Sequence, residues 1–417
     1  MATLPYLDRD LSWLSFNERV LDEAHDPAVP LASRVRFMAI FSANRDEFFR
    51  VRVDALRTLA RLRKKHPTKN PFLDPEWVLT KIAHQVDRQQ QRFDTLFEEQ
   101  IAPALKQANV VLYRDEPLAE IHRLEAAAFF RSTVLAYLQP VFVGSHRRMK
   151  RRDKLPLLDS QALYFALTLR PKSTADEQEL VMAYLNIPKD KLPRFIELSP
   201  LEGVSYFVFL DDIIRANLSV VFPGYLIQAS ASGACFSFKL NRGEDMSIQD
   251  EYRGNLVKKI KHQLAKRKTG QAVRFLYDHS IPPELLARFV HLFRLDEDDL
   301  MAGGRYHSLS DLMKLPLAAK PGLPPLPKAH LEPYESLFAA IGQQDRLLHF
   351  PYQSYSYVLR FFNEAAIDPL VYDIQVAFYR IAADSLIANA LMSAAHNGKR
   401  VTVFVEVKAR FDEANNL

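Results

Sequence analysis

The spacing of apolar residues changes twice along this chain, and each change constrains the fold. From Pro30 to Ala55, apolar residues recur three and four positions apart, the pattern of one buried helix face. A second helix is expected to begin at Asp74-Pro75-Glu76, with aspartate as N-cap and proline at the first helical position. The first hundred residues therefore predict an antiparallel helical pair.

From about residue 110 the pattern favours short strands mixed with helices. Leu163, Phe165, Leu167 and Leu169 alternate with other residues, as in a strand. Further strands are expected at 180–187, 194–198, 205–209, 234–240 and 272–277, and helices at 117–138, 212–220 and 252–267. This mixture predicts an α+β domain.

A proline-rich segment at 315–327 predicts a boundary, beyond which the pattern becomes α/β. Strands at 374–379 and 401–407 enclose a helix that starts at Asp384-Ser385 and ends at Asn397-Gly398, which makes one βαβ unit of two parallel strands. Parallel sheets are normally covered on both faces, so we expect a third domain cut short at Leu417. The predicted division is 1–108, 109–316 and 317–417.

Composition excludes several classes of protein. With 48% hydrophobic and 25% charged residues the chain is neither disordered nor a membrane protein, and the single cysteine, Cys235, cannot form an intramolecular disulfide. The uncharged stretch 216–238 contains Pro223-Gly224 and favours two buried segments around a turn over a membrane span. No signal peptide is evident. We expect a cytoplasmic protein and leave association with a membrane surface open.

The net charge of +5 matters less than its clusters, at 146–154 and 258–268. Such clusters attract polyanions, although each is equally well explained as a solvated surface. The glycine-rich phosphate-loop and dinucleotide motifs, H-E-x-x-H and C-x-x-C are all absent from the sequence. Asn397-Gly398-Lys399 follows a predicted helix and is better explained as a helix stop than as a phosphate loop.

Asn44 is a polar residue within the apolar stripe of the first long helix. A carboxamide in that position needs hydrogen-bond partners, which could be structural or could be a nucleotide base or phosphate. Its neighbour Asp46 is most simply explained by an intrahelical pair with Arg50.

Arg380 and Arg410 each fall at the carboxyl end of one of the two parallel strands, where open α/β sheets bind ligands. Neighbouring strands lie about 4.8 Å apart, so both guanidinium groups could converge on one phosphate. The alternative is that each pairs with a local carboxylate such as Asp384, Asp412 or Glu413.

Several blocks of the sequence resemble the bacterial polyphosphate kinase 1 family, in the order of that family. They are Leu11-Ser-Trp-Leu-Ser-Phe-Asn-Glu-Arg-Val-Leu-Asp-Glu-Ala24, Phe41-Ser-Ala-Asn-Arg-Asp-Glu-Phe-Phe-Arg-Val-Arg-Val53, Ala302-Gly-Gly-Arg-Tyr-His307, Pro351-Tyr352, Asp368-Pro369, Tyr379-Arg380, Asp384-Ser385, Ala395-His-Asn-Gly-Lys399 and Val407-Lys-Ala-Arg-Phe-Asp-Glu413.

The resemblance implies a phosphotransferase that moves the terminal phosphate of ATP reversibly onto inorganic polyphosphate, with Mg²⁺, through a phosphohistidine. It implies a multidomain architecture: a helical N-terminal domain, an α+β head domain used for homo-oligomerisation, and phospholipase-D-like α/β domains, of which this chain would hold the start of one. Its partners would be ATP, ADP and polyphosphate, and nucleic acid is not expected.

Residue by residue, Asn44 matches the family's ATP-contacting asparagine, and Arg380 and Arg410 match two arginines at its magnesium-phosphate site. An arginine cannot ligate a metal, so we expect both to clamp the phosphates that carry it. Arg45 departs from the leucine usual in the family.

None of the twelve histidines matches the phosphohistidine, whose motif lies after the last block quoted above. We therefore expect this chain alone to be inactive, with no catalytic residue of its own. The alternative function is a non-catalytic polyanion-binding or dimerisation module.

Overall fold

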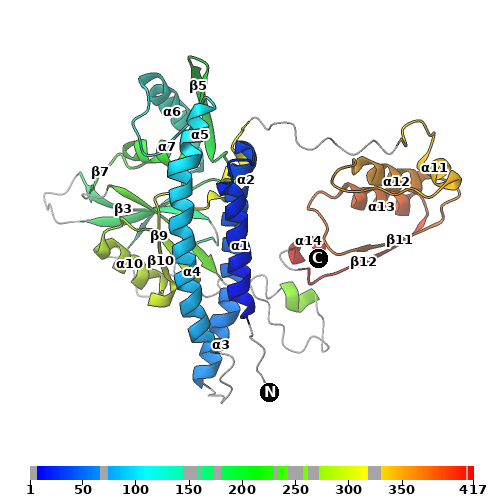
Figure 1. The fold of residues 1–417 in the computed structure, drawn as a ribbon, viewed down its shortest axis with the longest axis horizontal. Helices are drawn as coiled ribbons and strands as arrows, with labels where there is room; N and C mark the ends of the chain where they lie inside the picture. The colour runs from blue at the N-terminus through cyan, green and yellow to red at the C-terminus, as the bar shows by residue number, and fades with distance from the viewer. Residues whose placement is uncertain are drawn as a thin grey trace. The chain divides into compact units, whose positions relative to one another are not determined.

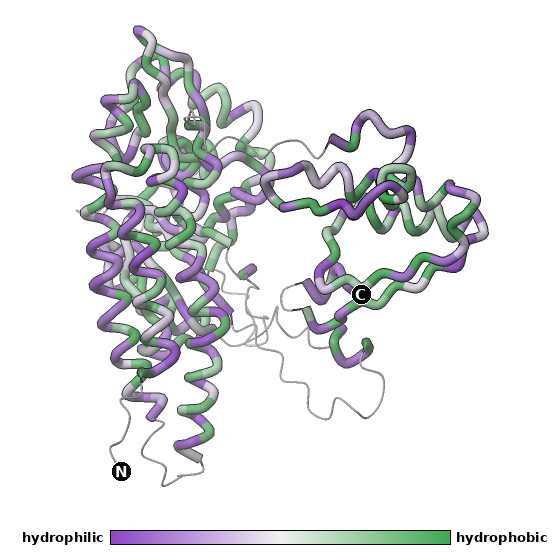
Figure 2. Tube along the Cα trace, turned by 45° about the vertical axis from the view of Figure 1, so that its right-hand side comes forward, coloured by the Kyte–Doolittle hydropathy of each residue, from purple (hydrophilic) through white to green (hydrophobic). Residues whose placement is uncertain are grey.

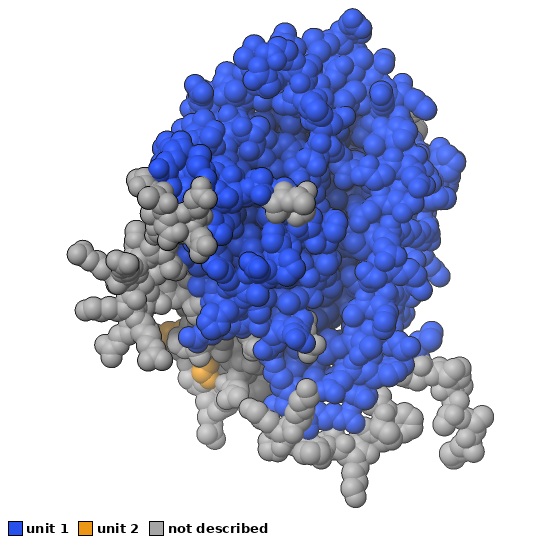
Figure 3. Space-filling view, turned by 90° about the vertical axis from the view of Figure 1, so that its left-hand side faces the viewer, with its two compact units in different colours: residues 1–246, 267–320 blue, residues 247–266, 321–417 orange. Residues whose placement is uncertain are grey.

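A computed structural model describes most of the chain: residues 7–65, 74–143, 158–159, 162–172, 180–229, 233–242, 257–261, 272–317, 330–409 and 412–417. The chain forms two compact units. Residues 1–246 and 267–320 make up the first, and residues 247–266 and 321–417 the second (Figure 3). Each unit is described by itself below.

The first unit begins with long helices, as the apolar spacing predicts. They are α1 (Arg9–His25), α2 (Leu31–Phe48), α3 (Asp54–Lys65), α4 (Pro75–Leu96) and α5 (Ala102–Gln107), with π-helical turns at Phe49–Val53 and Phe97–Ile101. Asp74 caps α4 by accepting a hydrogen bond from the backbone N of Glu76 at 3.1 Å, which confirms the predicted start. The predicted pair is part of a larger bundle, because α1 packs against both α2 and α4 (Figure 1).

The buried face of α2 is wider than the predicted stripe. Phe41 and Phe48 are buried as expected, and Phe41 stacks on Phe93 of α4 with ring centroids 5.7 Å apart. Arg45 is also buried, whereas Asn44 lies half-buried at the edge of the face. Helix α1 and the 3₁₀ turn at Leu309–Lys314 pack against α2, and Phe93 of α4 contacts it as well, so more than one side of α2 is covered.

Two sheets follow in the same unit. The first has the order β1-β6-β5 (Val110–Tyr113, Val204–Phe209 and Phe195–Leu201), with β1 parallel and β5 antiparallel to β6. The second has the order β10-β9-β8-β3-β4-β2, and β7 also pairs with β3. Its strands are β2 (Pro140–Val143), β3 (Leu163–Pro171), β4 (Val181–Ile187), β7 (Tyr225–Ile227), β8 (Cys235–Arg242), β9 (Ala272–Asp278) and β10 (Leu300–Gly303).

Every strand predicted between residues 163 and 277 is present, whereas β1, β2, β7 and β10 were not predicted. Those four strands have three or four residues each, too few for alternation to be visible. The helices of this region are α6 (Glu120–Ser132), α7 (Leu210–Ala216), α8 (Leu218–Val221) and α10 (Pro283–Phe293), with 3₁₀ turns at Val134–Tyr137, Glu297–Asp299 and Leu309–Lys314. The mixture confirms the α+β character of this region.

The sheet that contains β8 and β9 is buried on both faces. Phe238 and Phe275 pack on one side against α10. On the other side, Lys239 and Arg274 are buried although they are charged. Figure 2 shows green hydrophobic and purple hydrophilic residues interspersed along the chain.

The second unit contains the predicted βαβ arrangement. Strands β11 (Asp373–Phe378) and β12 (Arg400–Val405) are parallel and are joined by α13 (Leu386–His396). Ser385 caps α13, and Gly398, with φ of +83°, ends it as predicted. The remaining helices are α11 (Leu337–Gln343), α12 (Ser356–Ile367) and α14 (Glu413–Asn416).

The chain thus has the expected multidomain fold, with a helical N-terminal region, an α+β middle region and an α/β region at the end. No described helix is long and apolar enough to cross a membrane. The stretch 216–238 divides at Pro223-Gly224 as predicted, with α7 and α8 before the turn and β7 and β8 after it. The segment directly after the turn is less buried than predicted, since Leu226 of β7 is 42% exposed. Cluster 146–154 lies outside the described residues, and of cluster 258–268 the structure describes only 258–261, which are helical.

Candidate functional site

Asn44 has a structural partner in the neighbouring helix. Its Nδ2 donates to Oδ1 of Asn17 in α1 at 2.9 Å, and Nδ2 of Asn17 donates to the backbone oxygen of Phe41 at 3.2 Å. Asn17 is fully buried. The two amides therefore form a short chain of hydrogen bonds between α1 and α2 that ends at Asn44.

One face of the Asn44 amide is left open. Asn44 is half-buried, and its Oδ1 has no hydrogen-bond donor among the residues that the structure describes. Both explanations that the sequence allowed are thus compatible with the geometry: one end of the amide is used structurally and the other is free to meet a ligand.

The contacts of Asp46 show that the hypothesis of an intrahelical pair with Arg50 is wrong. Its Oδ2 accepts from Nζ of Lys239 in β8 at 2.6 Å, and its Oδ1 accepts from a guanidinium nitrogen of Arg274 in β9 at 3.1 Å. Asp46 thus joins α2 to the second sheet two residues beyond Asn44. A helix-only pattern could not show this contact, because its partners lie about two hundred residues away in sequence.

The Asp46 carboxylate is stabilised as an anion in this buried position. Burial by itself would raise its pKa, but the charges of Lys239 and Arg274 outweigh burial and lower the pKa to about 2. Burial acts in the other direction on the cation and lowers the pKa of Lys239 to about 8, against the attraction of Asp46.

Arg380 lies two residues beyond the carboxyl end of β11, as predicted. Its side chain is 55% exposed, and one guanidinium nitrogen lies 3.3 Å from Oδ2 of Asp412, which precedes α14. The local-carboxylate alternative therefore describes its resting state. An exposed ion pair of this kind contributes only about 0–1 kcal/mol, so an arriving phosphate can compete for the guanidinium group.

The backbone on both sides of Arg380 is held by one side chain, Asn416 of α14. Asn416 Nδ2 donates to the backbone oxygen of Tyr379 at 2.9 Å, and its Oδ1 accepts from the backbone N of Ile381 at 3.1 Å. The same Nδ2 donates to the backbone oxygen of Glu406, just beyond β12, at 2.7 Å. Asn416 thus fastens the two strand ends to each other.

Arg410, the other predicted phosphate clamp, lies outside the described residues. Asn44 belongs to the first unit and Arg380 to the second.

The strand ends supply a carboxylate that could help to hold a magnesium ion. No group of three or more histidine, cysteine, aspartate or glutamate side chains that could enclose a metal occurs among the described residues. Asp412, beside Arg380, supplies a carboxylate at the strand ends. One carboxylate together with nucleotide phosphates and waters is a donor set that Mg²⁺ commonly takes, so the residues fit a metal that arrives with its nucleotide.

Two buried histidines have structural roles. Nδ1 of His122 lies 3.0 Å from the hydroxyl of Tyr113 and its Nε2 lies 2.8 Å from the backbone oxygen of Ser199. Burial lowers the pKa of His307 to about 3, and its Nε2 lies 3.1 Å from the backbone oxygen of Ser237. Both rings are thus engaged with their surroundings.

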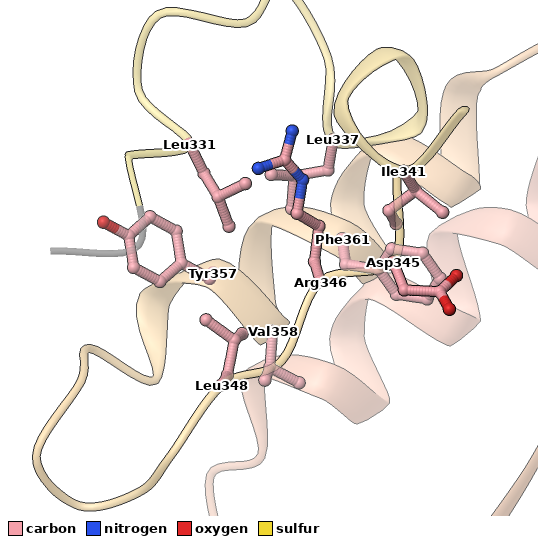
Figure 4. Close-up of a pocket in the computed structure, with 9 residues that line it drawn as sticks. All are labelled: Leu331, Leu337, Ile341, Asp345, Arg346, Leu348, Tyr357, Val358 and Phe361. Carbon is pink, nitrogen blue, oxygen red and sulfur yellow. The ribbon is translucent and has the colours of Figure 1, made fainter. Parts of the chain in front are cut away.

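The second unit also contains an apolar pocket of about 400 Å³ (Figure 4). The charged Arg346 at its wall is already engaged, since it donates to the backbone oxygen of Ala340 at 3.2 Å and to the hydroxyl of Tyr334 at 2.9 Å. The pocket does not include Arg380 or Asp412. Its lining residues are Leu331, Leu337, Ile341, Asp345, Arg346, Leu348, Tyr357, Val358 and Phe361.

Sequence reasoning missed Asn17, Asp46 and Asn416 as contributors to these sites. Asn17 lies on the buried stripe of α1 with Leu14 and Leu21, so the signal that identified Asn44 was also present there. No local signal distinguishes Asp46 or Asn416, because the partners of each are distant in sequence.

Three family models match successive parts of the chain. The polyphosphate kinase N-terminal domain matches residues 6–113, the polyphosphate kinase middle domain matches residues 121–315, and the polyphosphate kinase C-terminal domain 1 matches residues 336–417.

Curated relatives and a solved structure agree with these matches. The chain is 34% identical over 421 residues to a polyphosphate kinase of Vibrio vulnificus, covering 99% of this chain and 58% of that protein. It is 31% identical over 422 residues to a polyphosphate kinase of Escherichia coli strain K12, covering 99% and 59%. The crystal structure of polyphosphate kinase from Porphyromonas gingivalis aligns with a TM-score of 0.73 at 34% identity, covering 99% and 58%. The chain thus spans somewhat more than half the length of these relatives.

Proposed function

The chain belongs to the polyphosphate kinase family, and on that basis we propose that it binds ATP with Mg²⁺ and contributes to the reversible transfer of the terminal phosphate to inorganic polyphosphate. The observation that carries the proposal is Arg380, a largely exposed guanidinium group at the carboxyl ends of two parallel strands. Asn44 is proposed as the nucleotide contact, and Arg380 and Arg410 as the phosphate clamps.

The chemistry proposed for Arg380 is charge stabilisation. Its planar guanidinium group can donate two parallel hydrogen bonds to phosphate oxygens, replacing its exposed pair with Asp412. Asn416 holds the backbone on both sides of Arg380, so the segment that carries the guanidinium group is fixed before the phosphate arrives. Magnesium bound with the nucleotide would neutralise part of the phosphate charge, and Asp412 is the described carboxylate that could hold it.

The division into 1–108, 109–316 and 317–417, the cytoplasmic location and oligomerisation through the head domain are further parts of this proposal. On helix α6 of the middle region, Ile121 and Leu124 have exposed fractions of 50% and 58%, which supports a surface that meets a second copy.

A titration with ATP and Mg²⁺ tests the proposal, using Arg380→Ala and a matched control, Arg400→Ala. Arg400 is also an exposed arginine in an ion pair, 3.4 Å from Asp373, but it lies at the opposite, amino end of β12. Because charged hydrogen bonds contribute about 1.5–3 kcal/mol, we expect Arg380→Ala to weaken ATP binding roughly 10- to 100-fold and Arg400→Ala to leave it within about twofold. Equal effects of the two changes would contradict a phosphate clamp at Arg380.

The substitution Asn44→Ala distinguishes the proposed nucleotide site from the alternative function, a non-catalytic polyanion-binding module. A non-catalytic polyanion binder loses affinity steeply as salt rises and is insensitive to this change, whereas a nucleotide site loses affinity for ATP. We expect ATP binding to weaken in Asn44→Ala while polyphosphate binding at the same ionic strength is unchanged.

A further inference from the structure

We propose that Asn17 is a specificity-determining residue: it fixes the Asn44 amide in one orientation, so that Asn44 presents a hydrogen-bond acceptor to a nucleotide and favours a base with an amino group. This inference rests on the proposed nucleotide contact of Asn44. It adds which atom of Asn44 meets the ligand and why.

The orientation follows from a backbone oxygen. The Phe41 carbonyl can only accept, so the Asn17 atom 3.2 Å from it is the donor Nδ2, and the acceptor Oδ1 of Asn17 faces the other way. The Asn44 atom 2.9 Å from that oxygen must then be its donor, Nδ2. The orientation of the Asn17 amide therefore fixes the orientation of the Asn44 amide.

Burial holds this arrangement in place. Asn17 is fully enclosed in the helical bundle. Rotating its amide by half a turn would place two acceptor oxygens together at Phe41 and two donors together at Asn44. Each unsatisfied buried group costs about 1–3 kcal/mol, so the flipped state is scarcely populated.

The atom that remains for a ligand is Oδ1 of the half-buried Asn44, for which the described residues supply no hydrogen-bond donor. An acceptor oxygen repels phosphate oxygens, which are also acceptors, and attracts an amino group. The geometry therefore favours a base over a phosphate as the partner of Asn44. Adenine presents a donor at its six position, whereas hypoxanthine and guanine present an acceptor oxygen there.

Calorimetric titration of the 417-residue chain with ATP and with inosine triphosphate tests this orientation, because the two ligands share the same triphosphate and sugar. We expect ATP to bind roughly 3- to 10-fold more tightly, the effect of one gained or lost hydrogen bond. Purine riboside triphosphate, which has neither group at the six position, should fall between them.

Variants of Asn17 test its role in this preference. Asn17→Leu leaves Asn44 free to turn its Nδ2 toward a six-position oxygen, so the ratio of the two affinities should fall toward one. A merely structural role would weaken both nucleotides equally and leave the ratio unchanged, and that result in Asn17→Leu would overturn the inference.

Circular dichroism establishes whether each variant folds, and if Asn17→Leu does not, the three nucleotides compared on the wild-type chain still decide the orientation. Equal affinities for ATP and inosine triphosphate, both weakened by Asn44→Ala, would overturn this inference while supporting the nucleotide site. Absence of nucleotide binding by the wild-type chain would overturn the proposed function and this inference together.

Discussion

Two polar residues of α2, two positions apart, serve different purposes. Asn44 ends a hydrogen-bond chain and keeps one atom open, whereas Asp46 is enclosed by Lys239 and Arg274. Charges buried in this way seldom increase stability over an apolar core, but removing one partner leaves the others uncompensated. Asp46 therefore fixes where α2, and with it Asn44, lies against the second sheet.

We predict that Asp46→Asn lowers the free energy of unfolding at pH 7 by roughly 3–5 kcal/mol, because Lys239 and Arg274 would remain buried without their anion. Urea denaturation measures this. The control is Glu47→Gln, the neighbouring exposed carboxylate, which should change stability by no more than about 0.5 kcal/mol. Similar stabilities of the two variants would contradict the role given to Asp46.

The same contact predicts a pH dependence. The pKa of Asp46 is about 2 in the folded chain against an ordinary 3.8, so between these values the unfolded chain binds more protons. The stabilisation is complete above pH 3.8 and is lost as pH falls toward 2. We expect the difference between wild type and Asp46→Asn to shrink over that interval, and a constant difference would contradict the assignment.

Strand ends are the elements that position the proposed phosphate site. The βαβ connection places the carboxyl ends of β11 and β12 side by side, and the four-residue helix α14 returns to hold both through Asn416. Lys399, from the resemblance block after α13, donates to the backbone oxygens of Asp368 and Val371. That block is thus explained by local structure at the other end of the strands.

We predict that Asn416→Ala loosens the strand ends, because it removes the acceptor for the Ile381 N–H and the donors to the oxygens of Tyr379 and Glu406. Hydrogen exchange at Ile381 should accelerate roughly tenfold and ATP binding should weaken. Asn415→Ala, on the exposed side of the same short helix, is the matched control and should change neither. Unaltered exchange in Asn416→Ala would show that the clamp is dispensable.

At the scale of the whole molecule, the proposed contacts are divided between two compact units. Asn44 lies in the unit of residues 1–246 and 267–320, and Arg380 in the other.

We predict that the purified 417-residue chain binds ATP but makes no polyphosphate, because none of its twelve histidines matches the phosphohistidine of the family. The measurement is incorporation of labelled terminal phosphate into polyphosphate, with the full-length Vibrio vulnificus relative as a positive control. Chain growth catalysed by this polypeptide would contradict the prediction.

Most of the local architecture could be predicted from the sequence. Asp74, Ser385 and Gly398 mark helix ends through hydrogen bonds or dihedral angles that involve only nearby residues, so their effects are encoded locally. The long strands could be predicted for a similar reason, since apolar residues alternate with other residues over many positions along them. The short strands β1, β2, β7 and β10 depend on pairing with distant partners and were not visible.

The same distinction between local and distant contacts holds for the candidate site. The sequence by itself determined the chain's longer elements, the family and the candidates Asn44 and Arg380, because periodicity, capping and motif order are properties of neighbouring residues. Only the tertiary structure decided that Asn17 orients Asn44, that Asp46 is bound by two strands instead of its own helix, and that Asn416 holds both strand ends. The physical reason is that hydrogen bonds and ion pairs depend on distance in space, and folding brings together residues that are far apart in sequence.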